Sequence, residues 1–396
     1  MIPYFLSEGR RNKKFFIQFG GQGNSFLKEL QILYEQKDLK EFFDVAFDAI
    51  QFCLSREDIK SELDIYYPKG FPLKAWLEKK ETPAENYLSN CTITFPGNQI
   101  TQLGTLYLFT KYGYEPDEFL NYVHSTTGHS GGLQASVIFA LGKKGKDLLN
   151  IIYKFIIWYT IAAYHAQKAY GFPQVDKELL EWSLTYDRHH PYPMVVVAGM
   201  EFEEISTLIE KFHNCYPEVN EFPLKISLIN GKNIFVVTGH AKDLVSFRRE
   251  FYSLFLEKKI QWNYVPVSIP FHRSDTMKEK IIDFFNDEAC KSLGITGKDL
   301  KIPVISFTDG SNLQYKENIP VYLADIMMNQ VLYWEKSISP LLSSQSHIDY
   351  VLDFGPGKIT TILTKTALQY YGLLDRVSVI SFVGRSGISQ MLKKTD

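Results

Sequence analysis

The sequence predicts an α/β protein in which a parallel sheet with helices carries a small inserted subdomain of the ferredoxin-like kind. The chain has 396 residues, 45% hydrophobic and 15% aromatic, enough for a large core. A buried apolar run at 13–19 leads into a glycine-rich turn, as at the start of an α/β unit. Between 192 and 267 the apolar pattern follows the order β-α-β-β-α-β, which is the ferredoxin-like order.

The first half is expected to be mostly helical. After the strand at 13–19, a helix is predicted from about Ser25. The segment 26–77 carries charged residues at helical spacing and predicts several surface helices. The further helices are expected at 100–113, at 116–122, directly after residue 132, and at 151–165.

The second half begins with the predicted small subdomain. Its strands are expected at 193–199, 224–230, 233–239 and 263–269, and its helices at 201–212 and 243–258. A tight turn at Asn230-Gly231 is predicted, because Asn-Gly between apolar runs is a strong hairpin signal. We therefore place the small subdomain at 192–267 and the large one at 1–191 and 268–396, with the runs at 302–307 and 349–355 completing its sheet.

Composition and charge argue against several classes of function. Lys plus Arg total 43 against 45 Asp plus Glu, a net charge of -2, so the chain has no general attraction for nucleic acid or an anionic membrane. The longest uncharged apolar stretch is 155–164, whereas a membrane helix needs about 20 residues. The chain begins without a basic-then-apolar leader, so we expect an intracellular, cytoplasmic protein. The four cysteines lack CxxC pairs and ligand spacing, which predicts reduced thiols and no bound metal.

A glycine-flanked serine is the first candidate for chemistry. Gly128-His129-Ser130-Gly131-Gly132 matches G-x-S-x-G, in which small residues let the backbone turn sharply between a strand and a helix and expose the hydroxyl. The amides of the following helix would stabilise an oxyanion. We therefore predict that Ser130 is a nucleophile, with an ordinary helix N-cap as the alternative.

A serine nucleophile needs a base, usually a histidine. His272 stands at the end of a predicted strand just after the small subdomain, where a cleft between two units would be lined. His129 adjoins the serine and is expected to face away from it as structural support. The remaining histidines that we weighed lie in loops, helices or turns without neighbouring chemistry: His189, His190, His213, His240 and His347.

Four motifs occur together in a characteristic order. They are Phe19-Gly20-Gly21-Gln22-Gly23-Asn24, Gly128-His129-Ser130-Gly131-Gly132, Pro270-Phe271-His272 and Asp353-Phe354-Gly355-Pro356-Gly357. With them the chain resembles the acyl-CoA:acyl-carrier-protein transacylases over residues 14–385. It is more similar to the acetyl (starter-unit) transferase domain of fungal type I fatty-acid synthase β chains than to the compact bacterial malonyl transacylases.

The resemblance implies an α/β-hydrolase-like large subdomain and an acyltransferase of fatty-acid or polyketide biosynthesis. It implies acyl carrier protein and acyl-CoA as partners, besides larger synthase subunits. CoA or phosphopantetheine thioesters would be the substrates, with no permanently bound cofactor. By this likeness Ser130 takes the acyl group as an ester, His272 is its base, and the backbone amides of Gln22 and Gly131 form the oxyanion hole. The group that orients the base falls on the carbonyl of Met327, seven residues before Trp334, or on Asn329.

Specificity is predicted from a missing arginine. Malonyl-selective relatives carry an arginine on the helix after the nucleophile, which pairs with the substrate's free carboxylate. Here no arginine follows Ser130 before Arg188, and the corresponding place falls near Ala162. We therefore expect an acyl pocket with Ala162 and Phe271 that takes an uncharged group, acetyl or longer. Lys154 would bind a carboxylate only if it faced the pocket.

Four other functions stay open at this point. The same pair could serve an acyl-thioester hydrolase that edits a carrier, or a malonyl-type transacylase. The chain could also be a non-catalytic subunit that docks a carrier, or a lipase-like hydrolase that uses Asp187 or Glu250. Lys358 and the run Lys143-Lys144-Gly145-Lys146 could meet the phosphates of CoA or the acidic face of a carrier.

Overall fold

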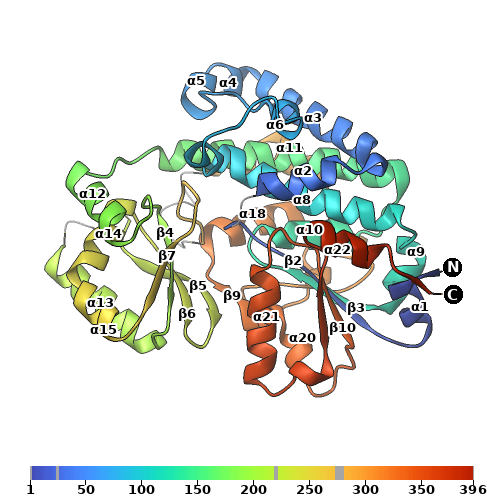
Figure 1. Cartoon of the computed structure of the whole chain (residues 1–396). Helices are drawn as coiled ribbons and strands as arrows, with labels where there is room; N and C mark the ends of the chain where they lie inside the picture. The colour runs from blue at the N-terminus through green and yellow to red at the C-terminus, as the bar shows by residue number, and fades with distance from the viewer. Residues whose placement is uncertain (1, 24–25, 218–221, 273–280, 396) are drawn as a thin grey trace.

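The chain folds around two sheets that lie beside each other (Figure 1). The computed structural model describes residues 2–23, 26–217, 222–272 and 281–395. The strands of the large sheet are β2 (Phe15–Phe19), β3 (Val123–Gly128), β8 (Val304–Ile305), β10 (Tyr350–Asp353) and β11 (Ser378–Ser381). They are all parallel, in the order β11-β10-β2-β3-β8. The predicted α/β class with two sheets is confirmed.

The central strand β2 shows why this sheet forms. All five of its residues are buried, as expected for a parallel strand covered on both faces. Its neighbours β3 and β10 bring residues 123–128 and 350–353 alongside it. The last third of the chain therefore completes this sheet, as predicted.

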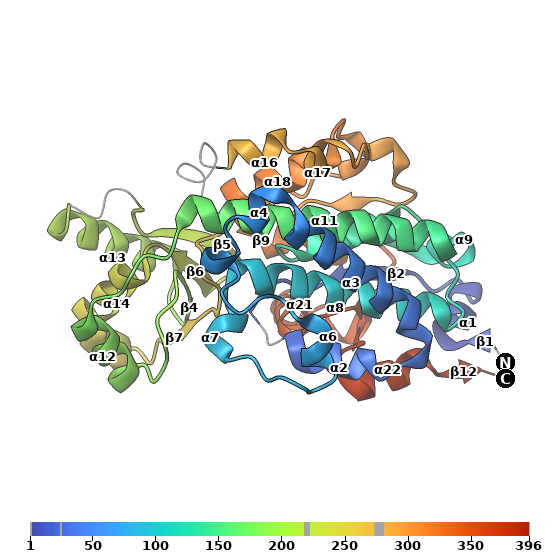
Figure 2. The ribbon, with the colours of Figure 1, turned by 90° about the horizontal axis from the view of Figure 1, so that it is seen from above.

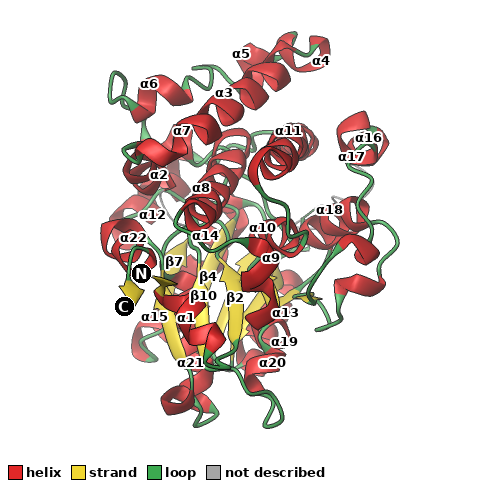
Figure 3. Ribbon diagram, turned by 90° about the vertical axis from the view of Figure 1, so that its right-hand side faces the viewer, coloured by secondary structure: helices red, strands yellow, loops and turns green. Residues whose placement is uncertain are grey.

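Helices cover the large sheet in layers, which Figure 3 shows from the side. The helices of this part are α8 (Cys91–Lys111), α9 (Pro116–Phe119), α10 (Gly132–Ala140) and α11 (Gly145–Tyr170). α10 packs on β2 and β3, while α8 and α11 pack on each other. The prediction for α8 began nine residues too late, because the helix runs through Pro96 within a fully buried environment.

The segment before α8 forms an additional helical layer above α8 and α11 (Figure 2). Its helices are α2 (Phe26–Tyr34), α3 (Lys40–Ser55), α4 (Glu57–Lys60), α5 (Leu63–Tyr66), α6 (Leu73–Leu77) and α7 (Glu85–Leu88). Their inner faces belong to the main core, with Phe42 and Trp76 buried. The charged residues at helical spacing thus mark the outer faces of packed helices.

The strands of the small sheet are β4 (Met194–Ala198), β5 (Lys225–Gly231), β6 (Ile234–Thr238), β7 (Gln261–Tyr264) and β9 (Leu332–Tyr333). The order is β7-β4-β6-β5-β9, and its first four strands have the ferredoxin-like arrangement. The accompanying helices are α12 (Lys177–Tyr186), α13 (Phe202–Cys215), α14 (Ala241–Glu250) and α15 (Tyr252–Glu257). The subdomain limits at 192 and 267 stay our proposal. The sequence did not lead us to expect β9, which joins β5 in parallel from the last third of the chain.

The predicted turn at Asn230-Gly231 is wrong. Strand β5 continues to Gly231, which pairs with Ile234, so the turn lies at Lys232 and Asn233. The pairing shifts register between Ile229 and Gly231, and such a bulge re-aims the side chain between them. Asn230 is consequently buried at the cleft instead of standing at the hairpin tip.

The rest of the chain returns to the large part. Its helices are α16 (Ile282–Asn286), α17 (Glu288–Lys291), α18 (Ile319–Asn329), α19 (Trp334–Ser337), α20 (Ser339–Leu342), α21 (Ile359–Tyr370) and α22 (Gly384–Met391). At the two ends, β1 (Ile2–Pro3) pairs with β12 (Lys394–Thr395), next to helix α1 (Tyr4–Arg10). Within the described residues, no helix is both long and apolar enough to cross a membrane.

Candidate active site

Ser130 sits at a sharp turn between β3 and α10. Its φ is 51°, a left-handed conformation that a non-glycine residue rarely adopts. The turn is tight because Gly132 packs against the backbone of Phe19 and Gly20, where a Cβ would lie 2.4 Å from both carbonyl oxygens. The geometry of this elbow matches the expectation from G-x-S-x-G.

We expect Gly128→Ala to destabilise the fold by about 3 kcal/mol, the upper end of the usual cost of overpacking. A Cβ on Gly128 would lie 1.9 Å from the carbonyl carbon of Gly132, so the elbow would have to open. Gly231→Ala is the control, because nothing lies within 4 Å of a Cβ there. Urea denaturation of both variants measures the difference. Equal stability of Gly128→Ala and the wild type would contradict the tight elbow.

The glycine loop after β2 lies against this elbow. A Cβ on Gly21 would be 2.7 Å from the carbonyl oxygen of His129 and 3.3 Å from the Ser130 Cβ. Gln22 lines the same cavity as Ser130. Among the described residues, neither Gln22 nor Gly131 donates its backbone N–H to a protein acceptor. The last residue of the loop motif, Asn24, lies outside the described residues.

His272 reaches Ser130 from the far side of the cleft. Its Nδ1–H donates to the carbonyl oxygen of Gln330 (3.0 Å), so Nε2 carries the lone pair and accepts the Ser130 hydroxyl proton at 2.7 Å. Its φ is 61°, so both members of the pair stand on left-handed backbone. Such conformations persist where the surrounding structure imposes them, and they cluster at functional sites.

Burial sets the protonation state of His272. The side chain is buried, and loss of solvation lowers its pKa to about 3. The imidazole is therefore neutral at physiological pH and ready to take a proton. The adjacent residues Arg273 and Ser274 lie outside the described part of the chain.

The residues expected to orient the base do not contact its ring. The Met327 carbonyl accepts the backbone N–H of His272 (3.0 Å), and the Asn329 amide donates to Asp325 (3.0 Å). The ring is held by the carbonyl of Gln330, because the chain leaves α18 there and its backbone acceptors are no longer used within the helix. This corrects our assignment by one to three residues.

His129 is held away from the reacting pair. Its Nε2–H donates to Oδ1 of Asn230 at 2.8 Å, and its ring lies 5.4 Å from that of Trp334. Burial lowers its pKa to about 4, so it is neutral too. His129 thus ties the elbow to the bulge of β5, in keeping with the expected supporting role.

A buried polar network fixes the turn at 355–357 beside the glycine loop. The Asp353 carboxylate accepts hydrogen bonds from Gln18 (2.9 Å), Thr360 (2.8 Å) and Thr361 (2.6 Å). Burial raises the pKa of Asp353. The N–H of Gly20 donates to the carbonyl of Gly355 (2.7 Å). This turn leads into α21, whose first residue, Ile359, lines the cavity of the serine.

The cavity in front of Ser130 has a volume of about 220 Å³. Its wall toward the small sheet is mostly apolar, with Met194, Val196, Leu228, Val236, Val265 and Val267, and carries the polar side chains of Asn230, Asn263 and Tyr264. Among the described residues, no lysine or arginine lines it, and the only ring bases, His129 and His272, are neutral. A substrate carboxylate would meet no cation from the described residues.

The two predicted acyl-pocket residues differ in position. Phe271 lines the cavity, whereas Ala162 is buried in α11 and does not. Aromatic rings fill the space between: Phe271 packs on Phe95 (5.6 Å), which packs on Tyr159 (4.6 Å). The Tyr159 hydroxyl donates to the Gly131 carbonyl (2.7 Å). Lys154, also on α11, is exposed and does not line the cavity.

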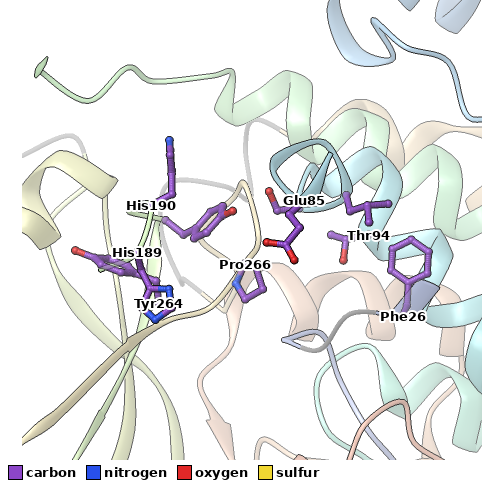
Figure 4. A pocket seen from close by; sticks show the side chains of 10 residues that line it. Phe26, Glu85, Thr94, His189, His190, Tyr264 and Pro266 are labelled. Carbon is purple, nitrogen blue, oxygen red and sulfur yellow. The ribbon is translucent and has the colours of Figure 1, made fainter. Parts of the chain in front are cut away.

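A second cavity of about 330 Å³ adjoins the first. The two share Tyr264 in their walls. Figure 4 shows Glu85, Thr94 and Phe26 on its helical side and His189 and His190 on the side of the small sheet. The two loop histidines, predicted to be ordinary surface residues, are exposed and line this cavity.

The other charged groups singled out from the sequence lie elsewhere. Lys144 pairs with Asp117 of α9, at the end of the molecule away from the small sheet (Figure 2).

The carboxylates of Asp58 and Asp287 lie near His165 in a group that could hold a metal ion. Arg56 already pairs with both, at 2.9 Å and 2.7 Å, so the two carboxylates share one guanidinium in an ion-pair network.

Two contacts of the site escaped the sequence analysis. Gln330 and Asn230 reach their histidines across 58 and 101 residues of chain. Gln330 acts through its backbone, which leaves no signature of residue type. The sequence predicted a turn at Asn230, so a contact between Asn230 and a histidine was not expected.

Comparison with known proteins assigns the chain to a defined family. Residues 17–272 match the family described as "Starter unit:ACP transacylase in aflatoxin biosynthesis". The chain is 26% identical to the fatty acid synthase subunit beta of Saccharomyces cerevisiae over 89% of the length of this chain. It is 24% identical to the fatty acid synthase beta subunit aflB of Emericella nidulans over 91%. The chain spans less than a fifth of these relatives, 18% and 17% of their lengths.

Solved structures share the fold. FabD from Acinetobacter baumannii superposes with a TM-score of 0.59 at 16% identity, covering 96% of this chain and 97% of that one. The acyl-carrier-protein-S-malonyltransferase from Bartonella henselae gives 0.61 at 16% identity, over 96% and 98%. Four ordered motifs, the two-sheet architecture and a match over residues 17–272 agree, and the chain belongs to the starter unit:ACP transacylase family.

Proposed function

We propose that this protein transfers an uncharged acyl group, acetyl or longer, to the phosphopantetheine thiol of an acyl carrier protein through an ester on Ser130. The observation that carries the proposal is the 2.7 Å contact between the Ser130 hydroxyl and a neutral His272. It lies in an apolar cavity without a described cationic wall residue. The donor is an acyl thioester of CoA or of a carrier.

The reaction follows from the positions of the two side chains. His272 Nε2 takes the Ser130 proton while Oγ attacks the thioester carbonyl. The oxyanion is met by the amides of Gln22, in the loop after β2, and of Gly131, at the N-terminal start of α10. The departing thiolate then takes the proton from His272, leaving the ester. In the second half, the carrier thiol gives its proton to His272 and attacks the ester, and Ser130 recovers the proton.

The two cavities support this proposed sequence of steps because they have room for the substrate. The acyl group fits the apolar wall of the small sheet. The rest of the thioester has room past Tyr264 in the adjoining cavity, whose lining combines hydroxyl groups with apolar surface. A pantetheine arm likewise combines polar groups, its amides, with apolar methyl groups.

We expect intact-mass spectrometry to find a Ser130 adduct with acetyl-CoA or a longer acyl-CoA, and much less with malonyl-CoA. An unpaired buried carboxylate costs about 3 kcal/mol, which lowers the rate of acylation roughly 100-fold. Ser130→Ala, exposed to the same mixture, is the blank. A preference for malonyl-CoA would make the chain a malonyl-type transacylase. Immediate release of free acid without an acceptor thiol would make it a hydrolase.

A further inference from the structure

One face of α21 is exposed and carries both apolar and basic side chains. Ile359 is 39% exposed, Ile362 58% and Tyr370 60%. They lie at helical spacing, while Thr364 and Leu368 on the opposite face are buried. Exposed apolar side chains that are grouped on one face can mark an interaction site. We call the α21 patch the set Lys232, Lys358, Ile359, Ile362, Lys365 and Tyr370.

The charge of the α21 patch is uniformly positive. Lys358 and Lys365 are exposed, and residues 355–372 contain no Asp or Glu. Lys232, from the turn between β5 and β6, lies over the Tyr370 ring at 5.8 Å. None of the three lysines has an ion-pair partner within the described residues. Two acidic groups lie next to this helix. Glu335 accepts from Tyr371 at its C-terminal end (2.8 Å). Glu29 accepts from the N–H of Gly357 just before the helix (2.7 Å) and interacts electrostatically with Lys358.

The patch is continuous with the catalytic cavity. Ile359 is exposed at the surface and also lines the cavity of Ser130 and His272. A Cβ on Gly23 would contact both Ile359 and Val265 at 3.6 Å, so Ile359 stands at the rim between the glycine loop and the small sheet. Lys232 extends the patch from α21 onto the small sheet. A partner seated here lies at the mouth of the cleft.

We propose that the α21 patch docks the acyl carrier protein, and this rests on the function proposed above. The partner is a small acidic protein whose apolar surface covers Ile359 and Ile362 and whose carboxylates face the three lysines. Complementary charge of this kind speeds association and sets orientation. With the chain's net charge at -2, the local lysines provide the attraction that the whole molecule lacks. The thiol arm of the docked carrier would enter the cavity beside Ile359.

The test compares Lys358→Glu/Lys365→Glu with Lys143→Glu/Lys146→Glu. Both pairs change the net charge by four units, and the second lies near α9 at the other end of the molecule. The probe is the phosphopantetheinylated carrier domain of a fungal fatty-acid synthase, with its Kd measured by calorimetry at low and at high salt. We expect the α21 pair to weaken binding roughly 10- to 100-fold at low salt, with a smaller effect at high salt. The control pair should change Kd less than about threefold.

A second variant removes apolar surface without changing charge. Ile362→Ser should weaken carrier binding several-fold, while acylation from acyl-CoA and transfer to free pantetheine stay at the wild-type rate. Unchanged binding in both α21 variants would overturn the docking site, as would an equal loss of transfer to free pantetheine. Because binding is measured without turnover, this result is separate from a failure of the proposed chemistry, which would appear as absence of an acyl-enzyme in the wild type.

Discussion

Replacing Ser130 with alanine is expected to lower kcat/KM for acyl transfer about 10⁴- to 10⁶-fold, as removal of the nucleophile does in serine enzymes. The Ser130 hydroxyl is the only one hydrogen-bonded to a histidine in the described part of this cavity. Without it, the remaining amides and binding surfaces still position the thioester, so acyl-CoA binding should change little. Stopped-flow kinetics and binding measured on the same preparation separate the two quantities.

Ser136→Ala is the matched control for this experiment. Ser136 lies in α10 as well, is buried, and donates to the carbonyl of Leu133 (2.7 Å). It does not line the cavity, so its loss should leave transfer within about threefold of wild type, as for residues outside a reacting unit. A Ser130→Ala variant that still forms a covalent acyl adduct would place the nucleophile elsewhere.

Replacing His272 with glutamine is expected to slow acylation about 10²- to 10⁴-fold, the usual contribution of a general base. Glutamine keeps much of the volume beside Phe307, whose ring lies 5.3 Å from that of His272, but it cannot take the serine proton. His347→Gln, at an exposed position, is the control. Acylation of the His272 variant within tenfold of wild type would show that another group removes the proton.

The pH dependence of the wild type tests the same residue. A histidine with an ordinary pKa near 6.5 would lose its basic form as the pH falls through that value. Burial lowers the pKa of His272 to about 3, so the basic form persists and acylation should stay nearly constant from pH 8 to about pH 5. A single-turnover acylation profile measures this. An acid limb at pH 6.5 would show that the ring is solvated in solution.

The fold could be predicted where the chain carries local patterns. The apolar run of β2 and the alternation of apolar and polar residues around β4 to β7 predict these strands. The prediction of strands from the sequence fails where tertiary contacts override these local patterns. Strand β3 reads Val-His-Ser-Thr-Thr-Gly and gains its burial only from its neighbours. Short β9 has too few residues to show any period.

The residues of the site likewise fall into those that belong to a local sequence motif and those that do not. Ser130 and its glycines form a local motif because the turn imposes their sizes, and the contact between Ser130 and His272 followed from motif order. Asn230 and Gln330 act through geometry that no local pattern encodes. Ala162 was placed by register along a long helix, and it does not line the cavity, whereas Tyr159 one turn earlier packs on Phe95.

Strand β9 links the small sheet to the segment that holds His272. Gln330, which holds His272, is separated from β9 by a single residue, and β9 pairs with β5, whose bulge holds His129 through Asn230. A swing of the small sheet would pull on both histidines at once. The positions of both histidine rings therefore depend on the pairing of β5 with β9.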